Sequence, residues 1–288
     1  MIQNRYYDIR EYTSDDTSHD NAATLYLASE KNSNMKVLMK QFVLDDDELN
    51  EFGTEVQALT SISHPNIIRP IDVFEDVIYG TVVLPFAEGG DLFEALLNDS
   101  WHINDKDLRT FSYHLLSAVS TLHLNGIIHR DLKPENIVLT AKTFDPRMFC
   151  IIDAASSYIE NFTDKMNNSK FRCSRIYAPP EYCHNNVVTE KFDIWSIGMI
   201  LYLMVAKSVP FYIDLITPRT LKRVLENRNQ LFSGNRWDEI SDDMKILIGS
   251  FLSFDPNDRP TASEALNNFI FYNFSLECDD QLKIEGCD

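Results

Sequence analysis

The chain has 288 residues, with 26 Lys or Arg against 44 Asp or Glu, so its formal net charge is −18 at pH 7. Such an excess of carboxylates disfavours nucleic acid and anionic membranes as partners, because both present phosphates that the protein would repel. With 44% hydrophobic and 24% charged residues, the composition is that of a globular protein. The length suits one large domain or two modest lobes.

Five cysteines, at positions 150, 173, 183, 278 and 287, form no Cys-x-x-Cys pair, and no histidines lie at metal-binding spacing. Neither a disulfide framework nor a zinc site is therefore indicated, and we expect a reducing, cytoplasmic location, with the nucleus also open. The first residues contain no apolar core of a secretory signal. The apolar run 194–206 is shorter than the roughly 18 residues that a membrane span needs, and it predicts a buried core helix.

The first part of the chain, up to residue 86, is predicted to be rich in strands. Residues 35–43 and 77–86 are short apolar or β-branched runs bounded by turn-forming residues. Between them an acidic run precedes apolar residues at helical spacing, which predicts one amphipathic helix. The apolar positions are Phe52, Val56, Leu59 and Ile62.

From Asp91 onward the pattern becomes helical. Apolar residues form one stripe over residues 105–125, and Gly126 follows as a stop signal. The adjacent Gly89 and Gly90 lie between a predicted strand and a predicted helix. They indicate a hinge between two lobes.

The most informative stretch is residues 129–136, which read His-Arg-Asp-Leu-Lys-Pro-Glu-Asn. It closely resembles the catalytic loop of the eukaryotic protein kinases. Further matches follow in the family's order: Asp153, Ala178-Pro179-Pro180-Glu181, Asp193-Ile194-Trp195 and Asp258-Arg259-Pro260. The resemblance extends from about residue 6 to about residue 273. It implies a bilobal α+β fold with a β-rich N-lobe at 1–86, a helical C-lobe at 87–275 and an acidic tail at 276–288.

The resemblance assigns the transfer chemistry to four polar side chains. Phosphoryl transfer from ATP mainly requires holding the γ-phosphate in line with the acceptor and neutralising charge on its oxygens. Asp131 would accept or orient the proton of the substrate hydroxyl, and Lys133 would point toward the transferring phosphate. Asn136 and Asp153 would supply oxygen ligands for Mg²⁺. The resemblance also implies that Lys40 contacts the α- and β-phosphates and that Glu55 pairs with it.

The same comparison implies the adenine site. Leu84 would line its back and Val138 its floor, while the carbonyl of Pro85 and the N–H of Ala87 would bond the base. Asp91 falls near the ribose.

Three departures from the family weaken nucleotide handling. The first glycine of the chain is Gly53, so the Gly-x-Gly-x-x-Gly loop before Lys40 is absent, and residues 18–23 stand in its place. Glycine serves there because it permits positive φ angles and close approach of the backbone to phosphates. The family's Asp-Phe-Gly reads Asp153-Ala154-Ala155, which loses a packed ring. Leu38 replaces a small residue and would press on the adenine ring.

Two functions from different classes remain open. The first is a protein serine/threonine kinase, favoured by Lys133 and by Ser174, which stands where such enzymes keep a Thr that contacts the catalytic Asp. The second is a pseudokinase that binds nucleotide weakly or not at all and acts by docking or allosteric control; the three departures favour it. A small-molecule kinase is a weaker third choice, since such enzymes lack the motifs at 178–181, 193–195 and 259.

The resemblance further predicts a monomer acting on protein substrates. Asp91 and Glu135 fall where some kinases bind an Arg that lies three residues before the acceptor. An equally good explanation is that Asp91 serves only the ribose and that Glu135 only completes the common motif. Arg130 is of the type that pairs with a phosphorylated activation segment, for which Ser169 is favoured over a replacement by Lys170. Asp193 is expected to bond the backbone of the catalytic loop, and Glu181 to form a buried ion pair with Arg259.

Overall fold

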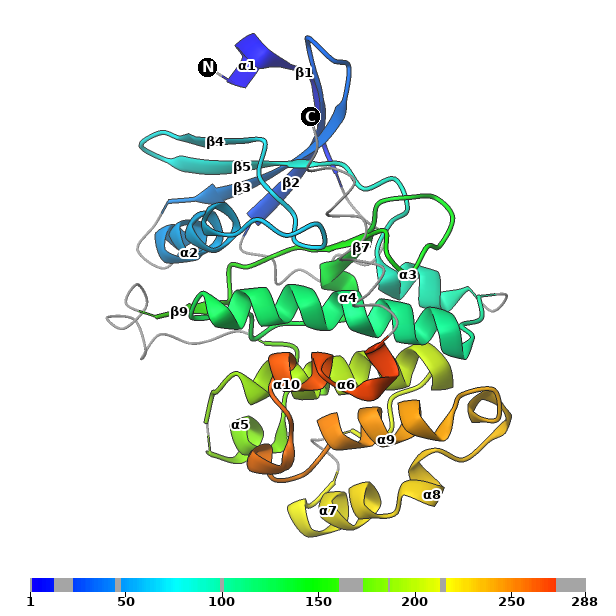
Figure 1. Cartoon of the computed structure of the whole chain (residues 1–288). Coiled ribbons are helices and arrows are strands. Elements are labelled where there is room, and N and C mark those ends of the chain that lie inside the picture. The colour runs from blue at the N-terminus through cyan, green and yellow to red at the C-terminus, as the bar shows by residue number, and fades with distance from the viewer. Residues whose placement is uncertain are drawn as a thin grey trace.

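An antiparallel sheet of five strands forms the first part of the chain. The computed structural model describes residues 2–12, 23–44, 48–98, 101–160, 173–185, 187–212 and 216–272, and within them the strand order is β1-β2-β3-β5-β4 (Figure 1). The elements of this lobe are α1 (Ile2–Arg5), β1 (Tyr6–Glu11), β2 (Ala23–Glu30), β3 (Lys36–Val43), α2 (Glu48–Ser61), β4 (Asp72–Glu75) and β5 (Tyr79–Pro85). The two predicted strands and the predicted helix are thus present as β3, β5 and α2.

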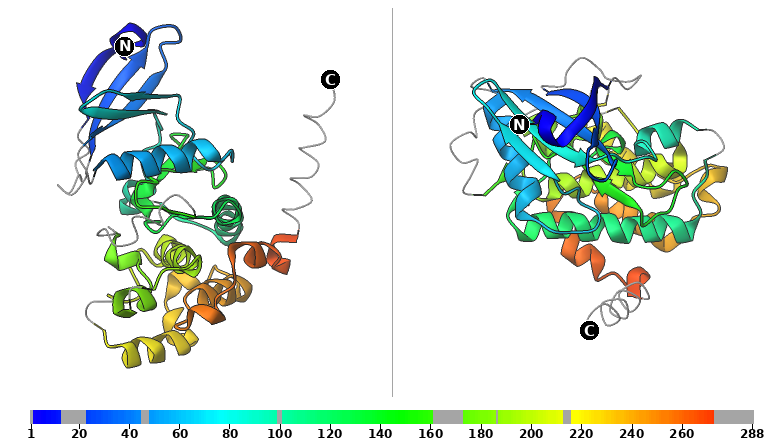
Figure 2. Two further views of the ribbon diagram at one scale, coloured as in Figure 1. Left: turned by 90° about the vertical axis from the view of Figure 1, so that its left-hand side faces the viewer. Right: turned by 90° about the horizontal axis from the view of Figure 1, so that it is seen from above.

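The two faces of this sheet are covered differently. Successive residues of a strand point to opposite faces. Phe42 packs with α2 in the main core. On the opposite face of the sheet, Met39 and Val83 form a separate small core with Tyr6. Figure 2 shows α2 lying under the sheet, between it and the helical lobe. Side chains that alternate with Met39 on β3 are therefore directed toward the helical lobe.

The rest of the described chain is a mainly helical lobe below the sheet (Figures 1 and 2). Its helix α6 (Lys191–Ala206) carries apolar side chains on all its faces and is buried along nearly its whole length, as the run 194–206 predicts. Two short antiparallel strand pairs also belong to this lobe, β6 (Ile127–Ile128) with β9 (Tyr158–Ile159) and β7 (Ile137–Leu139) with β8 (Phe149–Ile151). The elements are α3 (Leu92–Leu97), α4 (Asp105–Leu124), β6 (Ile127–Ile128), β7 (Ile137–Leu139), β8 (Phe149–Ile151), β9 (Tyr158–Ile159), α5 (Pro180–Asn185), α6 (Lys191–Ala206), α7 (Pro218–Glu226), α8 (Arg228–Leu231), α9 (Asp242–Phe251) and α10 (Ala262–Leu266), with 3₁₀ turns at Pro134–Asn136, Arg175–Tyr177, Asn235–Trp237, Pro256–Asp258 and Phe269–Phe271.

The predicted hinge requires its glycines. A side chain at Gly89 would meet the carbonyl oxygen of Ala141 at 2.3 Å and that of Leu139 at 2.6 Å, and Gly90 has φ +73°. The backbone there bonds β7, since Gly89 N donates to Leu139 O at 3.0 Å and Leu139 N donates to Gly90 O at 2.8 Å. The segment that leaves the sheet is thereby fixed against the helical lobe.

A second connection joins the lobes behind the hinge. The buried Asn66 follows α2, and its Nδ2 donates to the carbonyls of Arg147 and Phe149 at 2.9 Å each. Ile151 N donates to Asn66 O at 2.8 Å, so the segment after α2 is hydrogen-bonded to β8. One continuous apolar core runs from Phe42 in the sheet to Phe271 near the end of the described chain.

These features make a bilobal α+β fold, as the resemblance implies. Among the helices of the described residues, none combines the length and the apolar character needed to cross a bilayer. Three of the sequence predictions concern residues outside the described ranges: the loop at 18–22, Ser169 with Lys170, and the tail at 276–288.

Candidate functional site

Lys40 on β3 joins the two lobes through two carboxylates. Its Nζ lies 2.6 Å from Glu55 Oε2 on α2 and 2.6 Å from Asp153 Oδ1 after β8. The register places Lys40 opposite Val82 of β5, and β3 therefore directs the ammonium group toward α2 and the helical lobe. The predicted pair of Lys40 and Glu55 is present, and Asp153 completes a charged group of three, called here the Lys40 triad.

The triad has one cation for two carboxylates, and this imbalance sets their protonation. The Glu55 side chain is fully buried, and its Oε1 has no hydrogen-bond partner among the described residues. Burial therefore raises the pKa of Glu55 to about 7, against the attraction of Lys40. Asp153 is 35% exposed, and although burial also acts on it, Lys40 holds its pKa below the usual range. Of the two carboxylates, Glu55 is therefore the one that takes up a proton more readily.

Asp131 is held in place by three neighbours. Its Oδ1 accepts a hydrogen bond from Ser174 N at 2.8 Å, and its Oδ2 lies 3.1 Å from Lys133 Nζ and 3.2 Å from Asn136 Nδ2. Lys133 Nζ also donates to Ser174 Oγ at 3.0 Å. The predicted approach of Ser174 to the catalytic-loop Asp is therefore present. These contacts fix the carboxylate in one orientation.

The loop that carries Asp131 is anchored from below by α6. Asp193, wholly buried near the start of α6, accepts hydrogen bonds from His129 N and Arg130 N at 2.9 Å each. These bonds hold Arg130 at φ +66°, a left-handed conformation that costs a residue with a side chain about 1–2 kcal/mol. The predicted bonding of Asp193 to the loop is present.

Two histidines complete this anchor of the catalytic loop, and neither contact was predicted from the sequence. His123 Nε2 lies 2.8 Å from Asp193 Oδ2, and His129 Nε2 lies 3.2 Å from the carbonyl oxygen of Ile152. His129 thus ties the loop to the residue before Asp153. His123 lies near the end of α4, six residues before His129. This position indicates a contact with Asp193 only when α4 and α6 are known to be adjacent.

Asp153 stands in a strained backbone conformation. Its φ angle is +60°, in the left-handed region that most residues avoid, and Arg130 shares this conformation. Such strain persists where surrounding contacts enforce it, and it is often found at functional sites. Ala154, in place of the family's Phe, is 2% exposed and belongs to the main core.

The residues predicted to surround adenine lie near the hinge on both lobes. Leu38 pairs with Leu84 across β3 and β5, and Leu38 occupies the same face of β3 as Lys40, two residues on. From the other lobe, Val138 on β7 forms an isolated backbone bridge with Asp91. Asp91 also begins α3, because its Oδ1 accepts a hydrogen bond from Glu94 N at 2.8 Å.

Pro85 and Ala87 flank the point where the chain leaves the sheet. Between them, Phe86 N donates to Lys36 O at 3.3 Å, which fixes this segment to β3. Their predicted bonds to a base involve backbone atoms only, so their role stays a prediction.

Below the loop, Arg259 forms the predicted buried ion pair. Its guanidinium bonds both carboxylate oxygens of Glu181, at 2.7 and 2.9 Å, and is 0% exposed. It also lies 4.8 Å from the centre of the Trp195 ring. This pair links the start of α5 to the turn before α10 and so fixes the end of the segment that contains Ser174.

Comparison with known proteins identifies the family. The family described as "Protein kinase domain" matches residues 21–271. The chain belongs to the protein kinase domain family. A solved structure titled "Crystal structure of Rad53 1-466 in complex with AMP-PNP" has a TM-score of 0.68 over 90% of this chain and 64% of that chain. At 24% identity it shows that the fold is that of a kinase.

Curated relatives of this kinase domain come from plants and a mammal. A CDPK-related protein kinase of Daucus carota is 30% identical over 81% of this chain and 38% of its own length. The calcium and calcium/calmodulin-dependent serine/threonine-protein kinase DMI-3 of Medicago truncatula is 32% identical over 80% of this chain and 43% of its own. Calcium/calmodulin-dependent protein kinase type IV of Mus musculus is 30% identical over 75% and 45%. The chain thus spans less than half the length of these relatives.

Proposed function

We propose that this kinase domain transfers the γ-phosphate of ATP to serine or threonine hydroxyls of proteins. The observation that carries the proposal is the fixed Asp131 carboxylate, which Ser174, Lys133 and Asn136 hold in one orientation beside the Lys40 triad. Membership in the family and the serine/threonine kinases among the relatives support it.

The described side chains divide the work of transfer between them. Asp131 is placed to orient the acceptor hydroxyl and to take its proton. Lys133 and Lys40 carry the positive charge that phosphate oxygens require, and Glu55 and Asp153 hold Lys40 in position. No covalent intermediate on the protein is needed.

The residues present fit one or two magnesium ions. Asn136 uses its Nδ2 to bond the Asp131 backbone at 2.8 Å, which leaves Oδ1 as a ligand, and the bonds of Asp153 to Lys40 and to Ala155 N use Oδ1 and leave Oδ2. Among the described residues no cluster of three or more His, Cys, Asp or Glu could hold a metal alone. Mg²⁺ would therefore rely on phosphate and water for most of its ligands, as it commonly does, and would neutralise charge on the phosphates when bound.

The proposal is tested by transfer of label from γ-labelled ATP, with Mg²⁺, to Arg-containing Ser/Thr peptides. We expect Asp131→Asn to lower the rate by about 10²- to 10⁴-fold, because the amide cannot accept the proton. The proposal would be contradicted if the original chain and the variant, both shown to be folded, transferred label only at the same background rate at millimolar ATP.

Label transfer at background level in both proteins would favour the pseudokinase alternative. The observations in its favour are the absence of glycine from residues 18–23, the partly buried Leu38 and the buried Ala154. Each affects nucleotide binding, and none removes a group proposed to act in transfer. For this reason we place catalysis first.

We further propose that peptide substrates carry an Arg three residues before the acceptor. Glu135, in the 3₁₀ turn after Lys133, has an Oε2 that is buried without a hydrogen-bond partner among the described residues. Burial, together with the nearby Asp91 and Asp131, raises the pKa of Glu135, so a guanidinium would be a favourable partner.

Peptide arrays test this preference. We expect peptides with Arg at that position to be phosphorylated faster than their Ala counterparts, and the difference to shrink in Glu135→Gln. Asp91→Asn is the companion change, since Asn preserves the helix cap. Equal rates for Arg and Ala peptides would refute the preference without touching the proposed reaction.

A further inference from the structure

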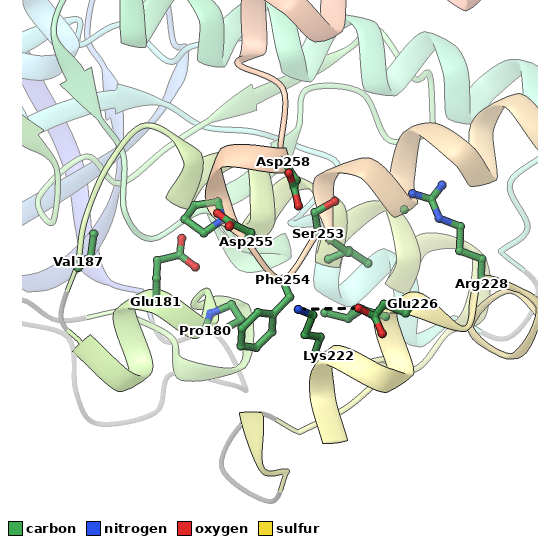
Figure 3. A pocket seen from close by; sticks show the side chains of 14 residues that line it. Pro180, Glu181, Val187, Lys222, Glu226, Arg228, Ser253, Phe254, Asp255 and Asp258 are labelled. Atoms are coloured by element: carbon green, nitrogen blue, oxygen red, sulfur yellow. Dashed lines mark ion pairs between the residues drawn. The ribbon is translucent and has the colours of Figure 1, made fainter. Parts of the chain in front are cut away.

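A groove of about 770 Å³ opens on the helical lobe, and none of the residues that line it belongs to the Lys40 triad (Figure 3). Its walls are the start of α5, helix α7, the end of α9 and the turn that follows α9. Pro180 and Glu181 line it, and they directly follow the segment with Ser174 that contacts Asp131. This volume lies in the range of sites that hold ligands, roughly 300–1,000 Å³.

Apolar residues make up about half of the lining of the groove. Leu225 from α7 and Leu252 from the end of α9 are almost fully buried, and Phe254 and Pro256 continue this surface along the turn. At the rim, Val187 is 44% exposed. An aliphatic side chain of a partner would be removed from water here, at roughly 25 cal/mol per Å² of apolar surface.

The two ends of the groove carry opposite charge. At one end Glu181 is already neutralised by Arg259, but Asp255 and Asp258 are exposed and have no ion-pair partner among the described residues. At the other end lies Arg228, whose guanidinium donates a long hydrogen bond of 3.4 Å to the carbonyl of Ile246. Figure 3 shows Asp255 with Glu181 on one side of the groove and Arg228 on the other.

Between the ends, the remaining charges cancel. Lys222 and Glu226 form an ion pair at 4.0 Å along α7. Arg228 stays exposed at one end, so the exposed carboxylates of Asp255 and Asp258 at the other end are the charges that a partner cation meets beside the apolar surface. A partner cation can therefore approach these two carboxylates without displacing a cationic side chain of the described residues.

We propose that this groove binds a segment of a partner protein in which an Arg or Lys lies next to aliphatic residues. The cation would face Asp255 and Asp258, and the aliphatic side chains would cover Phe254, Pro256 and Val187. The net charge of −18 also favours a basic partner, because long-range attraction steers it toward the protein. This binding does not depend on catalysis.

The test uses a fluorescein-labelled octapeptide of alternating Arg and Leu, which contains no residue that can be phosphorylated. Its binding to the whole chain is followed by fluorescence anisotropy, without ATP, at low and moderate salt. An octapeptide with Glu in place of Arg controls for charge. We expect the basic peptide to bind, the acidic one not to bind, and the affinity to fall as salt rises.

Three variants locate the site. Asp255→Asn with Asp258→Asn removes the two charges while Asn preserves the cap that Asp255 supplies at 2.9 Å to Asn257 N, and we expect affinity to fall about fivefold. Val187→Lys changes an exposed residue of the rim and should weaken binding as well. The matched control, Asp238→Asn with Glu239→Gln, removes two exposed carboxylates before α9 and should leave affinity unchanged.

Three outcomes would overturn the proposal. The first is equal weakening in the control pair, which would show attraction by net charge alone. The second is loss of binding in Glu135→Gln with none in the groove variants, which would place the peptide beside Asp131. The third is a dimer in sedimentation experiments that Val187→Lys dissociates, which would identify a second copy of the chain as the occupant.

Discussion

At the scale of single residues, Leu38 is the departure with the most direct consequence for nucleotide binding. It lies opposite Leu84 and on the same face of β3 as Lys40, where the proposed adenine site requires space. Overpacking of this kind typically costs about 1–3 kcal/mol. We expect Leu38→Ala to lower the KM for ATP about tenfold, measured by peptide phosphorylation at varied ATP. An unchanged KM would show that Leu38 does not contact the nucleotide.

The titration of Glu55 gives a second prediction at this scale. Its pKa rises from the ordinary 4.5 to about 7 in the folded protein because of burial, so the folded state binds more protons than the unfolded state between these values. A carboxyl group with a raised pKa stabilises the fold below pH 4.5, and this contribution is lost as pH rises toward and through 7. The full difference corresponds to about 3 kcal/mol.

Urea unfolding at pH 5 and pH 8 checks this. We expect the free energy of unfolding of the original chain to decrease relative to that of Glu55→Gln between the two pH values, because Gln does not titrate. Parallel changes in the two proteins would show that Glu55 is ionised throughout and that Lys40 outweighs its burial.

The sequence predicted individual contacts where a motif fixed both partners. Lys40 with Glu55, Ser174 with Asp131, and Glu181 with Arg259 are all present. It could not supply the roles of His123 and His129, since no local pattern shows that α4 and α6 pack side by side. Nor could it show that Lys40 contacts Asp153 as well, because that bond depends on how the lobes are joined.

At the scale of elements, α6 determines the shape of the catalytic loop. Asp193 accepts bonds from His129 N, Arg130 N and His123 Nε2, and all three rely on its two carboxylate oxygens. In Asp193→Asn one oxygen becomes an NH₂ group that faces hydrogen-bond donors. We expect a loss of roughly 3 kcal/mol in unfolding free energy, with a lower kcat as Arg130 leaves its left-handed conformation.

Urea unfolding and peptide phosphorylation measure these two effects. The matched control is Asp242→Asn, an exposed carboxylate at the start of α9, which should change neither value. A variant with normal stability and normal kcat would mean that the loop keeps its shape without α6.

Elements were predictable in proportion to their length and periodicity. The stripe over 105–125 corresponds to α4, and the apolar runs correspond to β3, β5 and α6. The short α1 and the two-residue strands β6 and β9 carry no pattern long enough to detect, because tertiary contacts rather than local preference form them.

At the scale of the whole molecule, the net charge of −18 acts on every basic partner alike. The Debye length falls from about 10 Å at 0.1 M salt to about 3 Å at 1 M, so attraction between the domain and a distant cation disappears over this range. We expect the KM for an Arg-containing peptide to rise several-fold between 0.05 and about 0.5 M NaCl, at saturating ATP. The KM for a peptide of the same acceptor sequence with Ala in place of Arg should change little.

The groove variants divide this salt effect between local and global charge. Asp255→Asn with Asp258→Asn reduces the net negative charge by two, from −18 to −16, and a purely global attraction would weaken only slightly. A short peptide confined to the region of Asp131 and Glu135 should therefore keep its salt dependence in that variant, whereas a longer peptide that extends an Arg-Leu segment to the groove should lose part of it. If both peptides respond equally, the whole field of the domain, rather than the groove, attracts basic substrates.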